Sequence, residues 1–365
     1  MRRMTVRIGI VGSRFVANAH AEGIRQTPGA ELVAAASPNP DHIWEFHRRW
    51  NVPHVFADYR DMFDLVDAIT VACPNDLHAP VTLAAAAAGK HVLVDKPLAI
   101  TLDECDQMIE ACARANVVLM YGENLCFAPK YVRARQLADE GAFGEVYFVK
   151  QLECHYGPHS DWFWDMSRAG GGVLMDMGCH SIAYCRWLFG NAPIESVSAD
   201  VSAVVHYGRT KGDDHAVVNI RFAPTEKHPR GGLGIAENSW ARTGGFDNRT
   251  EIYGSQGLTV ADMGRGGNLQ TFSAPGYTYS GQKVPWTRGW TWTGFEEAWS
   301  YGFPQEISNF VEAIEQGKQP MLTGEDGREV LEIICAAYLS ARTGQRQTLA
   351  GLDRKRLPVD FWLSD

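Results

Sequence analysis

Short apolar runs of strand length recur along the first third of the chain, and segments with helical patterns separate them. The runs are bounded by glycine, proline or asparagine, as strands are. The predicted strands are Val6–Val11, Leu32–Ala36, Ala68–Ala72, His91–Val94 and Val117–Met120. Strands that alternate with helices are typical of a doubly wound parallel sheet, so the pattern predicts an α/β fold for this part of the chain.

Three helices are predicted between these strands. The first follows Val11 and includes Asn18, His20 and Glu22. The second, Pro80–Ala88, is rich in alanine and stops at Gly89. The third spans Leu102–Asn116, with Thr101 as its N-cap and Glu104 at the capping-box position.

A different pattern begins beyond the segment Tyr121–Pro129. β-rich stretches separated by turn residues follow one another there, which predicts a second sheet. These stretches lie within Val146–Glu153, Ile194–Val205, Asp214–Phe222, Leu233–Trp240 and Thr250–Tyr253. We therefore expect one domain over residues 1–123 and another over residues 124–365.

Composition narrows the class of protein. The chain has 365 residues, of which 45% are hydrophobic and 21% charged, which is enough for two domains with sizeable cores. The net charge of −9 and the lack of a basic block argue against nucleic acid as a partner. No apolar run of about 18 residues is present, so we expect no membrane span. The eight cysteines form no C-x-x-C pair, so we expect no disulfide framework or zinc site and a reducing, cytoplasmic location.

The turn after the first strand has part of a dinucleotide-binding pattern. Gly12 stands at the tight turn and Ala17 at the position that packs the helix on the strand, but Arg14 replaces the middle glycine of G-x-G-x-x-G/A. The charge of Arg14 suits contact with phosphates or with adenosine. After the second strand, Ser37 stands where an acid would bind the ribose of NAD. We expect NAD as cofactor, with NADP left open.

A lysine follows the strand His91–Val94 directly, in the text Asp95-Lys96-Pro97. Lysine is rare at the end of a buried strand, because removing an ammonium group from water is costly. Ligands of open α/β sheets bind beyond the carboxyl ends of the strands, which is where Lys96 stands. A surface lysine in a loop is the alternative.

Asp176 and His180 are four residues apart, after the triple glycine 170–172. On a helix these two side chains would share a face. A histidine has an ordinary pKa of about 6.5, which suits a proton shuttle in the oxidation of an alcohol. Asp176 would orient the ring or bind a second hydroxyl, and Lys96 would stabilise the developing charge on the reacting oxygen.

Several segments in order resemble one family, the Gfo/Idh/MocA oxidoreductases, which include glucose–fructose oxidoreductase and inositol dehydrogenase. The resemblance covers nearly the whole chain. The segments that carry it are residues 12–20, Cys73-Pro74-Asn75-Asp76-Leu77-His78, residues 89–97, residues 170–180, Thr323-Gly324-Glu325-Asp326-Gly327 and residues 337–344. The resemblance implies an N-terminal Rossmann domain and a C-terminal α/β domain with a large, mostly antiparallel open sheet, often used for oligomerisation. We accordingly expect a homo-oligomer, either a dimer or a tetramer.

The resemblance also implies roles for individual residues. Lys96, Asp176 and His180 match the catalytic set of the family. The residues expected to bind the cofactor are Gly12, Arg14, Phe15, Val16, Ser37, Cys73, Pro74, Asn75, His78, Asp95, Lys96 and Asn124. The residues expected to bind substrate are Lys96, Asn124, His155, His159, Trp162, Trp164, Asp176 and His180.

Three positions depart from the family pattern, and the last two of them concern the substrate. Asp95 stands where the family has glutamate, and Ala183 stands where a second aspartate is frequent. After Asn124 the chain reads Leu125-Cys126, where many relatives have arginines, so an anionic substrate is disfavoured. The segments 122–131 and 157–165 are similar to bacterial glycoside dehydrogenases that oxidise the 3-hydroxyl of a glucosyl group, including those that initiate C-glycoside cleavage.

The segment His155–Asp165 is rich in histidine and tryptophan and is predicted to be a loop. Indole rings at Trp162 and Trp164 would stack on the apolar face of a sugar; packing between domains is the alternative. We expect no metal there, because no cysteine accompanies His155, His159 and Asp161. A second aromatic segment, residues 286–303, is interpreted as a subunit contact, with a wall of the substrate site as the alternative.

Three functions are consistent with these residues. The first is NAD(P)-dependent oxidation of a sugar, glycoside or cyclitol. The second is a glycosidase or lyase that oxidises its sugar transiently and makes no net NADH. The third is a dinucleotide-binding regulator without catalysis, which the presence of both Lys96 and His180 disfavours.

Overall fold

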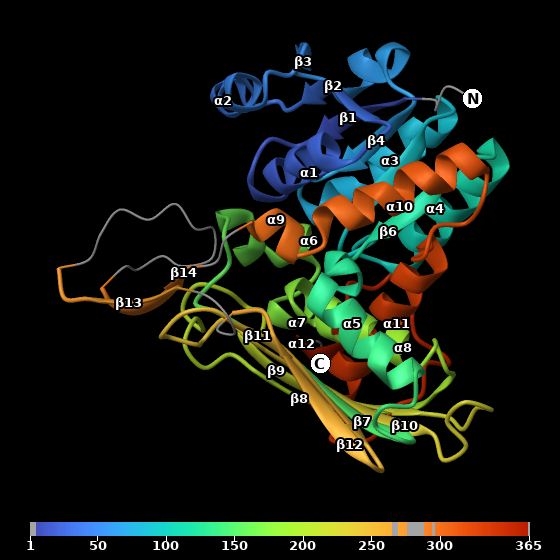
Figure 1. Ribbon diagram of the computed structural model, residues 1–365, viewed down its shortest axis with the longest axis vertical. Helices are drawn as coiled ribbons and strands as arrows, with labels where there is room; N and C mark the ends of the chain where they lie inside the picture. Colours follow the sequence, from blue (N-terminus) through green and yellow to red (C-terminus); the bar gives the residue numbers. More distant parts are fainter. Residues whose placement is uncertain (1–4, 265–268, 276–287, 294–295, 364–365) are drawn as a thin grey trace. The chain divides into compact units, whose positions relative to one another are not determined.

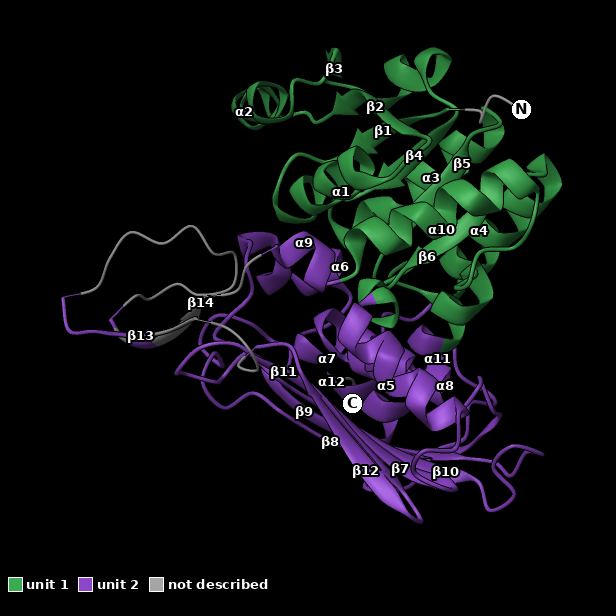
Figure 2. Ribbon diagram, viewed as in Figure 1, with its two compact units in different colours: residues 1–127, 302–329 green, residues 128–301, 330–365 purple. Residues whose placement is uncertain are grey.

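The computed structural model describes residues 5–264, 269–275, 288–293 and 296–363, and they form two compact units (Figures 1 and 2). Unit 1 comprises residues 1–127 and 302–329, and unit 2 comprises residues 128–301 and 330–365. Unit 1 is therefore built from two separate stretches of the chain.

Unit 1 contains a six-stranded parallel sheet in the order β3-β2-β1-β4-β5-β6. Its strands are β1 (Val6–Val11), β2 (Ala30–Ala36), β3 (His54–Phe56), β4 (Ala68–Val71), β5 (His91–Asp95) and β6 (Leu119–Gly122). Its helices are α1 (Phe15–Gln26), α2 (Pro40–Trp50), α3 (His78–Ala87), α4 (Leu102–Ala115) and α10 (Phe303–Gln316), with 3-10 turns η1 (Tyr59–Leu65), η2 (Asn75–Leu77) and η3 (Asn124–Phe127). This strand order is that of the doubly wound fold, so the predicted Rossmann domain is confirmed.

Local sequence explains these elements. The inner strands are continuous apolar runs because both of their faces are covered, as in β4, where every residue is buried. The side chain of Thr101 accepts a hydrogen bond from the N–H of Glu104, as the capping pattern predicts. Helix α2 and strand β3 are not predicted by the sequence analysis. The N-cap of α2 is Asn39, whose side chain accepts from the N–H of His42.

Helix α10 belongs to unit 1 although it lies late in the chain. It packs on α1, and the hydroxyl of Thr27 donates a hydrogen bond of 3.1 Å to the carbonyl oxygen of Pro304. The rings of His20 and Phe303 lie 5.8 Å apart in the same contact. The chain then continues into α11 (Gly324–Thr343), whose first turns belong to unit 1 and whose remainder belongs to unit 2.

Unit 2 is built on a second six-stranded sheet in the order β12-β11-β7-β10-β9-β8. The pair β7–β10 is parallel and the other pairs are antiparallel, which confirms the predicted mostly antiparallel sheet. The strands are β7 (Val146–Cys154), β8 (Ile194–Ser202), β9 (His215–Phe222), β10 (Gly232–Ser239), β11 (Asp247–Gly254) and β12 (Gly257–Asp262), with a separate hairpin of β13 (Leu269–Ser273) and β14 (Gly289–Thr293). The helices are α5 (Pro129–Asp139), α6 (Met166–Ala169), α7 (Val173–Asp176), α8 (Gly178–Leu188), α9 (Glu297–Ser300) and α12 (Asp360–Leu363), with a 3-10 turn η4 (Asp161–Trp164).

The two faces of this sheet differ. Helix α8 packs on β7 and β10, and helices α5 and α7 lie on the same face (Figure 1). A Cβ atom added to Gly234 would meet Cys185 of α8 at 3.1 Å, so alternate residues of β10 face this helix. On the opposite face, apolar register partners cross four strands: Leu258, Tyr253, Phe148 and Leu233.

Among the helices of the described ranges, none combines the length and the apolar character that crossing a bilayer requires.

Candidate active site

The carboxyl edge of the sheet in unit 1 gathers the residues expected to bind the cofactor. Gly12 follows β1, Ser37 follows β2 and Cys73-Pro74-Asn75 follow β4. Lys96 follows β5, and Asn124 follows β6. The strand order reverses between β1 and β4, which is the point where ligands of such sheets bind.

The turn at Gly12 has the shape that a phosphate-binding turn requires. Gly12 has φ +125°, and a Cβ atom there would lie 2.2 Å from the carbonyl oxygen of Ala72, so only glycine fits. Helix α1 begins directly afterwards. Its N-cap, Arg14, makes no side-chain capping hydrogen bond, and no acidic residue lies in the first turn. The positive end of the helix thus suits an anionic group, and the residues present fit the pyrophosphate of a dinucleotide.

Arg14 reaches toward the next helix rather than over its own turn. Its Nη1 lies 2.9 Å from Nε2 of His42 on α2. This contact links the β1–α1 turn to the helix that follows Ser37. Phe15 and Val16 form the first turn of α1 and are half-buried.

His78 holds two of the loops at this edge in place. The side chain is buried, its Nδ1 lies 2.7 Å from the carbonyl oxygen of Pro97, and its Nε2 lies 3.0 Å from the carbonyl oxygen of Cys73. Burial is the main cause that lowers the pKa of His78 below 6.5, which favours the neutral ring. The contact connects the loop after β4 with the loop that carries Lys96.

Lys96 is half-buried at the end of β5, and its N–H donates a hydrogen bond of 3.2 Å to the carbonyl oxygen of Gly122. The preceding residue, Asp95, pairs with Gly122 in the β5–β6 ladder. Asn124 is buried in the turn that follows β6. The backbone ladder therefore fixes the strand end from which the Lys96 side chain projects.

Asp176 and His180 lie in unit 2, at the junction of two helices. Asp176 is the last residue of α7 and His180 lies in the first turn of α8, with Met177 between the two helices. The single helix that the spacing suggests is thus interrupted, although the N–H of His180 still bonds the carbonyl oxygen of Met177 at 3.1 Å. Both side chains are mostly buried, with about 7% exposed.

The triple glycine before this junction makes room for a buried carboxylate. A Cβ atom on Gly172 would lie 2.0 Å from the carbonyl oxygen of Asp213. The Asp213 carboxylate accepts hydrogen bonds from the N–H groups of Gly172 (3.1 Å) and Leu174 (2.8 Å) and from the hydroxyl of Tyr338. Asp213 and Tyr338 thus hold the segment that bears Asp176, and neither is predicted from the sequence.

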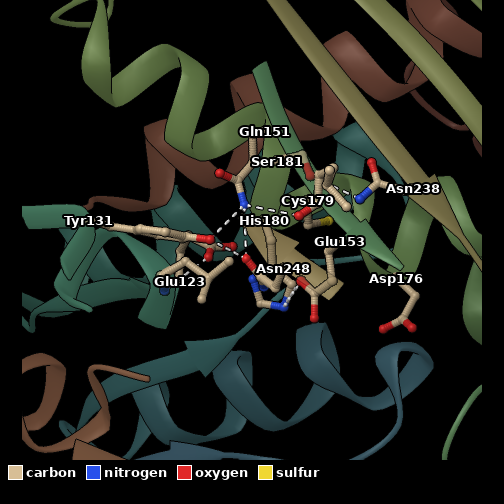
Figure 3. A network of polar contacts seen from close by, with 12 residues as sticks. Glu123, Tyr131, Gln151, Glu153, Asp176, Cys179, His180, Ser181, Asn238 and Asn248 are labelled. Atoms are coloured by element: carbon tan, nitrogen blue, oxygen red, sulfur yellow. Dashed lines mark hydrogen bonds and ion pairs between the residues drawn. The ribbon is translucent and has the colours of Figure 1, made fainter. Parts of the chain in front are cut away.

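Two further residues, Trp240 and Glu153, lie beside Asp176 and His180 and are not predicted from the sequence; Figure 3 shows Glu153 next to His180. The indole N–H of Trp240, a fully buried residue, donates a hydrogen bond of 3.1 Å to Oδ2 of Asp176. Oε2 of Glu153 on β7 lies 4.0 Å from Nε2 of His180. Asp176 therefore has a partner in the residue that follows β10, and His180 has one on β7.

The histidine- and tryptophan-rich loop joins this group through ring contacts. Trp164 lies 5.5 Å from Trp240, measured between ring centroids. Trp162 stacks on Phe163 at 3.8 Å, and the rings of His155 and His159 lie 4.8 Å apart. The segment Asp161–Trp164 forms a 3-10 turn within the predicted loop.

No group of three or more His, Cys, Asp or Glu side chains within the described part of the chain is arranged to hold a metal ion. In the second aromatic segment, Trp290 is 60% exposed and contacts Phe272. Trp299 is 48% exposed, whereas Phe303 is buried. Trp286 and Phe295 lie outside the described residues.

Known proteins match this chain along both units. Residues 6–123 match the family model described as "Oxidoreductase family, NAD-binding Rossmann fold", and residues 131–260 match the model of the GFO/IDH/MocA C-terminal domain. The myo-inositol 2-dehydrogenase of Thermotoga maritima is 28% identical, over 92% of this chain and 96% of its own. The levoglucosan dehydrogenase of Pseudarthrobacter phenanthrenivorans is 29% identical, over 92% of this chain and 95% of its own. Among solved structures, GenD2 from gentamicin A biosynthesis, in complex with NAD, is 30% identical and has a TM-score of 0.86. The match covers 94% of this chain and 96% of the GenD2 chain.

Proposed function

Because the chain belongs to the Gfo/Idh/MocA oxidoreductase family, we propose that it oxidises a secondary hydroxyl of a sugar, a glycoside or a cyclitol. It is an NAD-dependent dehydrogenase acting on CH–OH groups. Relatives named for inositol and for levoglucosan support a ring that carries several hydroxyls as substrate. The 3-hydroxyl of a glucosyl group is among the candidate positions.

One observation carries this proposal: an ionisable pair, Asp176 and His180, lies beside the buried indole of Trp240 in unit 2. Trp240 bonds Asp176 and contacts Trp164, so polar and aromatic groups meet in one place. A sugar ring needs both kinds of group, because its hydroxyls require hydrogen-bond partners and its C–H faces pack on aromatic rings. We assign substrate contact to His155, His159, Trp162 and Trp164 on the same reasoning, and to Asn124, which follows β6 in unit 1, from the family resemblance alone.

The protein residues divide the remaining work. Nicotinamide, when bound, accepts the hydride from the carbinol carbon. His180 takes the proton of the reacting hydroxyl, so the alcohol loses one proton and one hydride and becomes a ketone. Lys96 donates a hydrogen bond to the reacting oxygen and stabilises its developing negative charge. Asp176, held by Trp240, accepts a hydrogen bond from a second hydroxyl and fixes the ring.

The residues at the carboxyl edge of the parallel sheet bind the cofactor. The turn at Gly12 and the start of α1 bind the pyrophosphate. Arg14 lies beside His42 after Ser37, where the adenosine ribose of a dinucleotide lies in this fold. His78 keeps the loops at Cys73 and Pro97 in register.

The direct test is a screen for NADH formation. The protein is mixed with NAD and, in separate reactions, with sugars, methyl and aryl glycosides and inositols, and the absorbance of NADH is followed. We expect NADH with at least one class and a ketone product by mass spectrometry. Release of an aglycone without net NADH would instead show the redox-neutral reaction, and no turnover of any polyol would refute the proposal.

The role of Lys96 has a matched control in a lysine at the other end of β5. Lys96→Met removes the ammonium group at the carboxyl end of β5, so kcat falls by at least about a hundredfold while NAD affinity changes little. Lys90, which precedes β5, donates a hydrogen bond to the carbonyl oxygen of Val66 away from that edge. Lys90→Met is therefore expected to keep wild-type kcat. Full activity in Lys96→Met would refute the assignment.

We also propose that the chain forms a homo-oligomer through the open face of the sheet in unit 2. Leu258 and Val260 are 57% and 53% exposed there, and Tyr253 and Phe148 continue the apolar row with ring centroids 5.3 Å apart. Light scattering should give a multiple of the 40.4 kDa chain mass. The double variant Leu258→Asp, Val260→Asp should lower the measured mass to that of one chain. Val204→Asp, at another exposed position, should leave the mass unchanged. A monomeric wild type would refute this.

A further inference from the structure

Below His180, the helix-covered face of the sheet in unit 2 carries a row of polar side chains. Glu153 on β7 lies between two register partners, Asn238 on β10 and Asn248 on β11 (Figure 3). All three are buried, with at most 1% exposed. Burying a row of polar groups in the middle of a sheet is costly unless they are partnered, so this row calls for an explanation.

The two asparagines have clear structural partners. Asn238 donates a hydrogen bond of 2.9 Å to the hydroxyl of Ser181, the residue next to His180 on α8. Asn248 accepts one of 3.1 Å from the amide of Gln151 and another from the hydroxyl of Tyr131 on α5. These contacts fix the two helices on the sheet. They leave Glu153 as the charged member of the row.

Glu153 and His180 point toward one another (Figure 3). The distance of 4.0 Å between Oε2 and Nε2 is too long for a hydrogen bond and short enough for a strong interaction between charges. Both side chains are largely removed from water, at 1% and 9% exposure, so solvent screens this interaction little. A buried carboxylate at this position favours a positive charge on the imidazole.

Building on the proposed function, we propose that Glu153 is the counter-charge of protonated His180 during catalysis. The hydroxyl proton of the substrate passes to His180 and the hydride leaves the carbinol carbon, so the imidazole becomes positive. Glu153 remains a carboxylate throughout and forms no bond. The pair changes from one negative charge to no net charge, which lowers the barrier to proton transfer in a buried site. Glu153 is thus a positioning residue that acts through His180.

Two titratable neighbours of Glu153 do not compete for this role. Tyr131 on α5 and Cys154, the next residue of β7, both interact electrostatically with Glu153. Burial raises the pKa of Cys154 to about 12 and the pKa of Tyr131 well above 10, so both remain neutral at working pH. Gln151, Asn238 and Asn248 are neutral amides. Tyr131 and Cys154 therefore keep the same charge over the pH range of the test and do not account for a shift at His180.

The test replaces the charge and keeps the shape. In Glu153→Gln the acid limb of the kcat/KM profile for polyol oxidation is expected to move to lower pH by about one unit, because the imidazole loses the charge that favours its protonated form. The plateau rate is expected to fall by about three- to tenfold, because His180 becomes a weaker base. Glu153→Asp keeps the negative charge but moves it away from His180 by the length of one methylene. Its acid limb should therefore lie between those of the wild type and of Glu153→Gln. A merely structural glutamate would leave the limb unmoved in Glu153→Gln.

A matched control and a second measurement make the result independent of the substrate. Glu237, on the opposite face of β10, pairs with Lys150, and Glu237→Gln should leave the profile unchanged. Histidine ring signals are followed by NMR against pH, with the His180 signal identified by its loss in His180→Asn. In Glu153→Gln the midpoint of that signal should move to lower pH. An unmoved midpoint overturns the proposal even if the enzyme oxidises polyols, whereas a moved midpoint without turnover of any polyol refutes only the proposed function.

Discussion

A buried pair in unit 1 allows a quantitative prediction of stability against pH. His20 on α1 and Glu306 on α10 are 0% and 1% exposed, and their Nε2 and Oε2 atoms lie 3.9 Å apart. Neither side chain has a hydrogen-bond partner within the described residues. Burial lowers the pKa of His20 from 6.5 to about 4. Burial, reinforced by the negative charges of Asp95 and Glu123, raises the pKa of Glu306 well above 4.5. Burial therefore disfavours the charged form of each group in the folded protein.

The two shifts act on stability in opposite directions. As the pH falls below 6.5, the unfolded chain binds a proton at His20 and the folded chain does not, so stability is lost until the pH approaches 4. For His20 alone, the loss is about 0.2 kcal/mol at pH 7 and about 2 kcal/mol at pH 5. Glu306 binds its proton in the folded state first, so its contribution is lost as the pH rises above 4.5. Acidification from pH 7 to pH 5 therefore destabilises through His20 and stabilises through Glu306.

Single variants separate these contributions. The free energy of unfolding is measured by urea denaturation with circular dichroism at pH 7 and pH 5. His20→Leu removes the proton-binding group and keeps an apolar contact with Phe303. On acidification, the wild type should lose about 2 kcal/mol relative to this variant. Glu306→Gln removes the opposing group, so this variant should lose more on acidification than the wild type does.

The expected loss of stability on acidification requires that His20 be uncharged in the folded protein. A charged His20–Glu306 ion pair would instead raise the pKa of His20, and the wild type would then gain stability relative to His20→Leu on acidification. An equal pH dependence of the wild type and His20→Leu, or a change of that opposite sign, would refute the account.

Two predictions concern the two binding regions. Gly12→Ala places a Cβ atom 2.2 Å from the carbonyl oxygen of Ala72 and should abolish NAD binding, measured by calorimetry. Gly89 also has a positive φ (+68°) but open space around it, so Gly89→Ala should bind NAD normally. Equal NAD affinities of the two variants would contradict this prediction. Trp240→Phe keeps an aromatic side chain, although a smaller one, and removes the N–H that bonds Asp176 at 3.1 Å. The value of kcat/KM should then fall by about ten- to a hundredfold. An unchanged value would show that this hydrogen bond has no catalytic role.

Periodicity predicts the first sheet because its inner strands are buried on both faces and read as unbroken apolar runs. It does not reveal α2, which buries only Ile43 and Phe46 and otherwise reads as a polar loop after two prolines. In unit 2 the register of the strands has no signal in the sequence. The parallel β7–β10 pair, for example, joins segments that are far apart in the chain.

In the candidate site, too, some residues are predicted from the sequence and others become apparent only from the fold. Lys96, Asp176 and His180 stand in short motifs that a sequence displays directly. Trp240 lies 64 residues from its partner Asp176, and only the fold brings the two together. Glu153 carries a weak signal in retrospect, because a carboxylate among Leu152 and Cys154 in a central strand is costly without a role.

The position of α10 has a consequence for synthesis of the protein. A ribosome that has made residues 1–127 has made the whole parallel sheet, but the helix that covers α1 begins only at Phe303. At about 5–20 residues per second, the apolar surface around His20, Gly23 and Ile24 waits on the order of ten seconds for its cover. During that time this surface is exposed to water, and exposed apolar surface on an incomplete chain favours aggregation. A fragment that ends at residue 127 would keep this surface bare permanently.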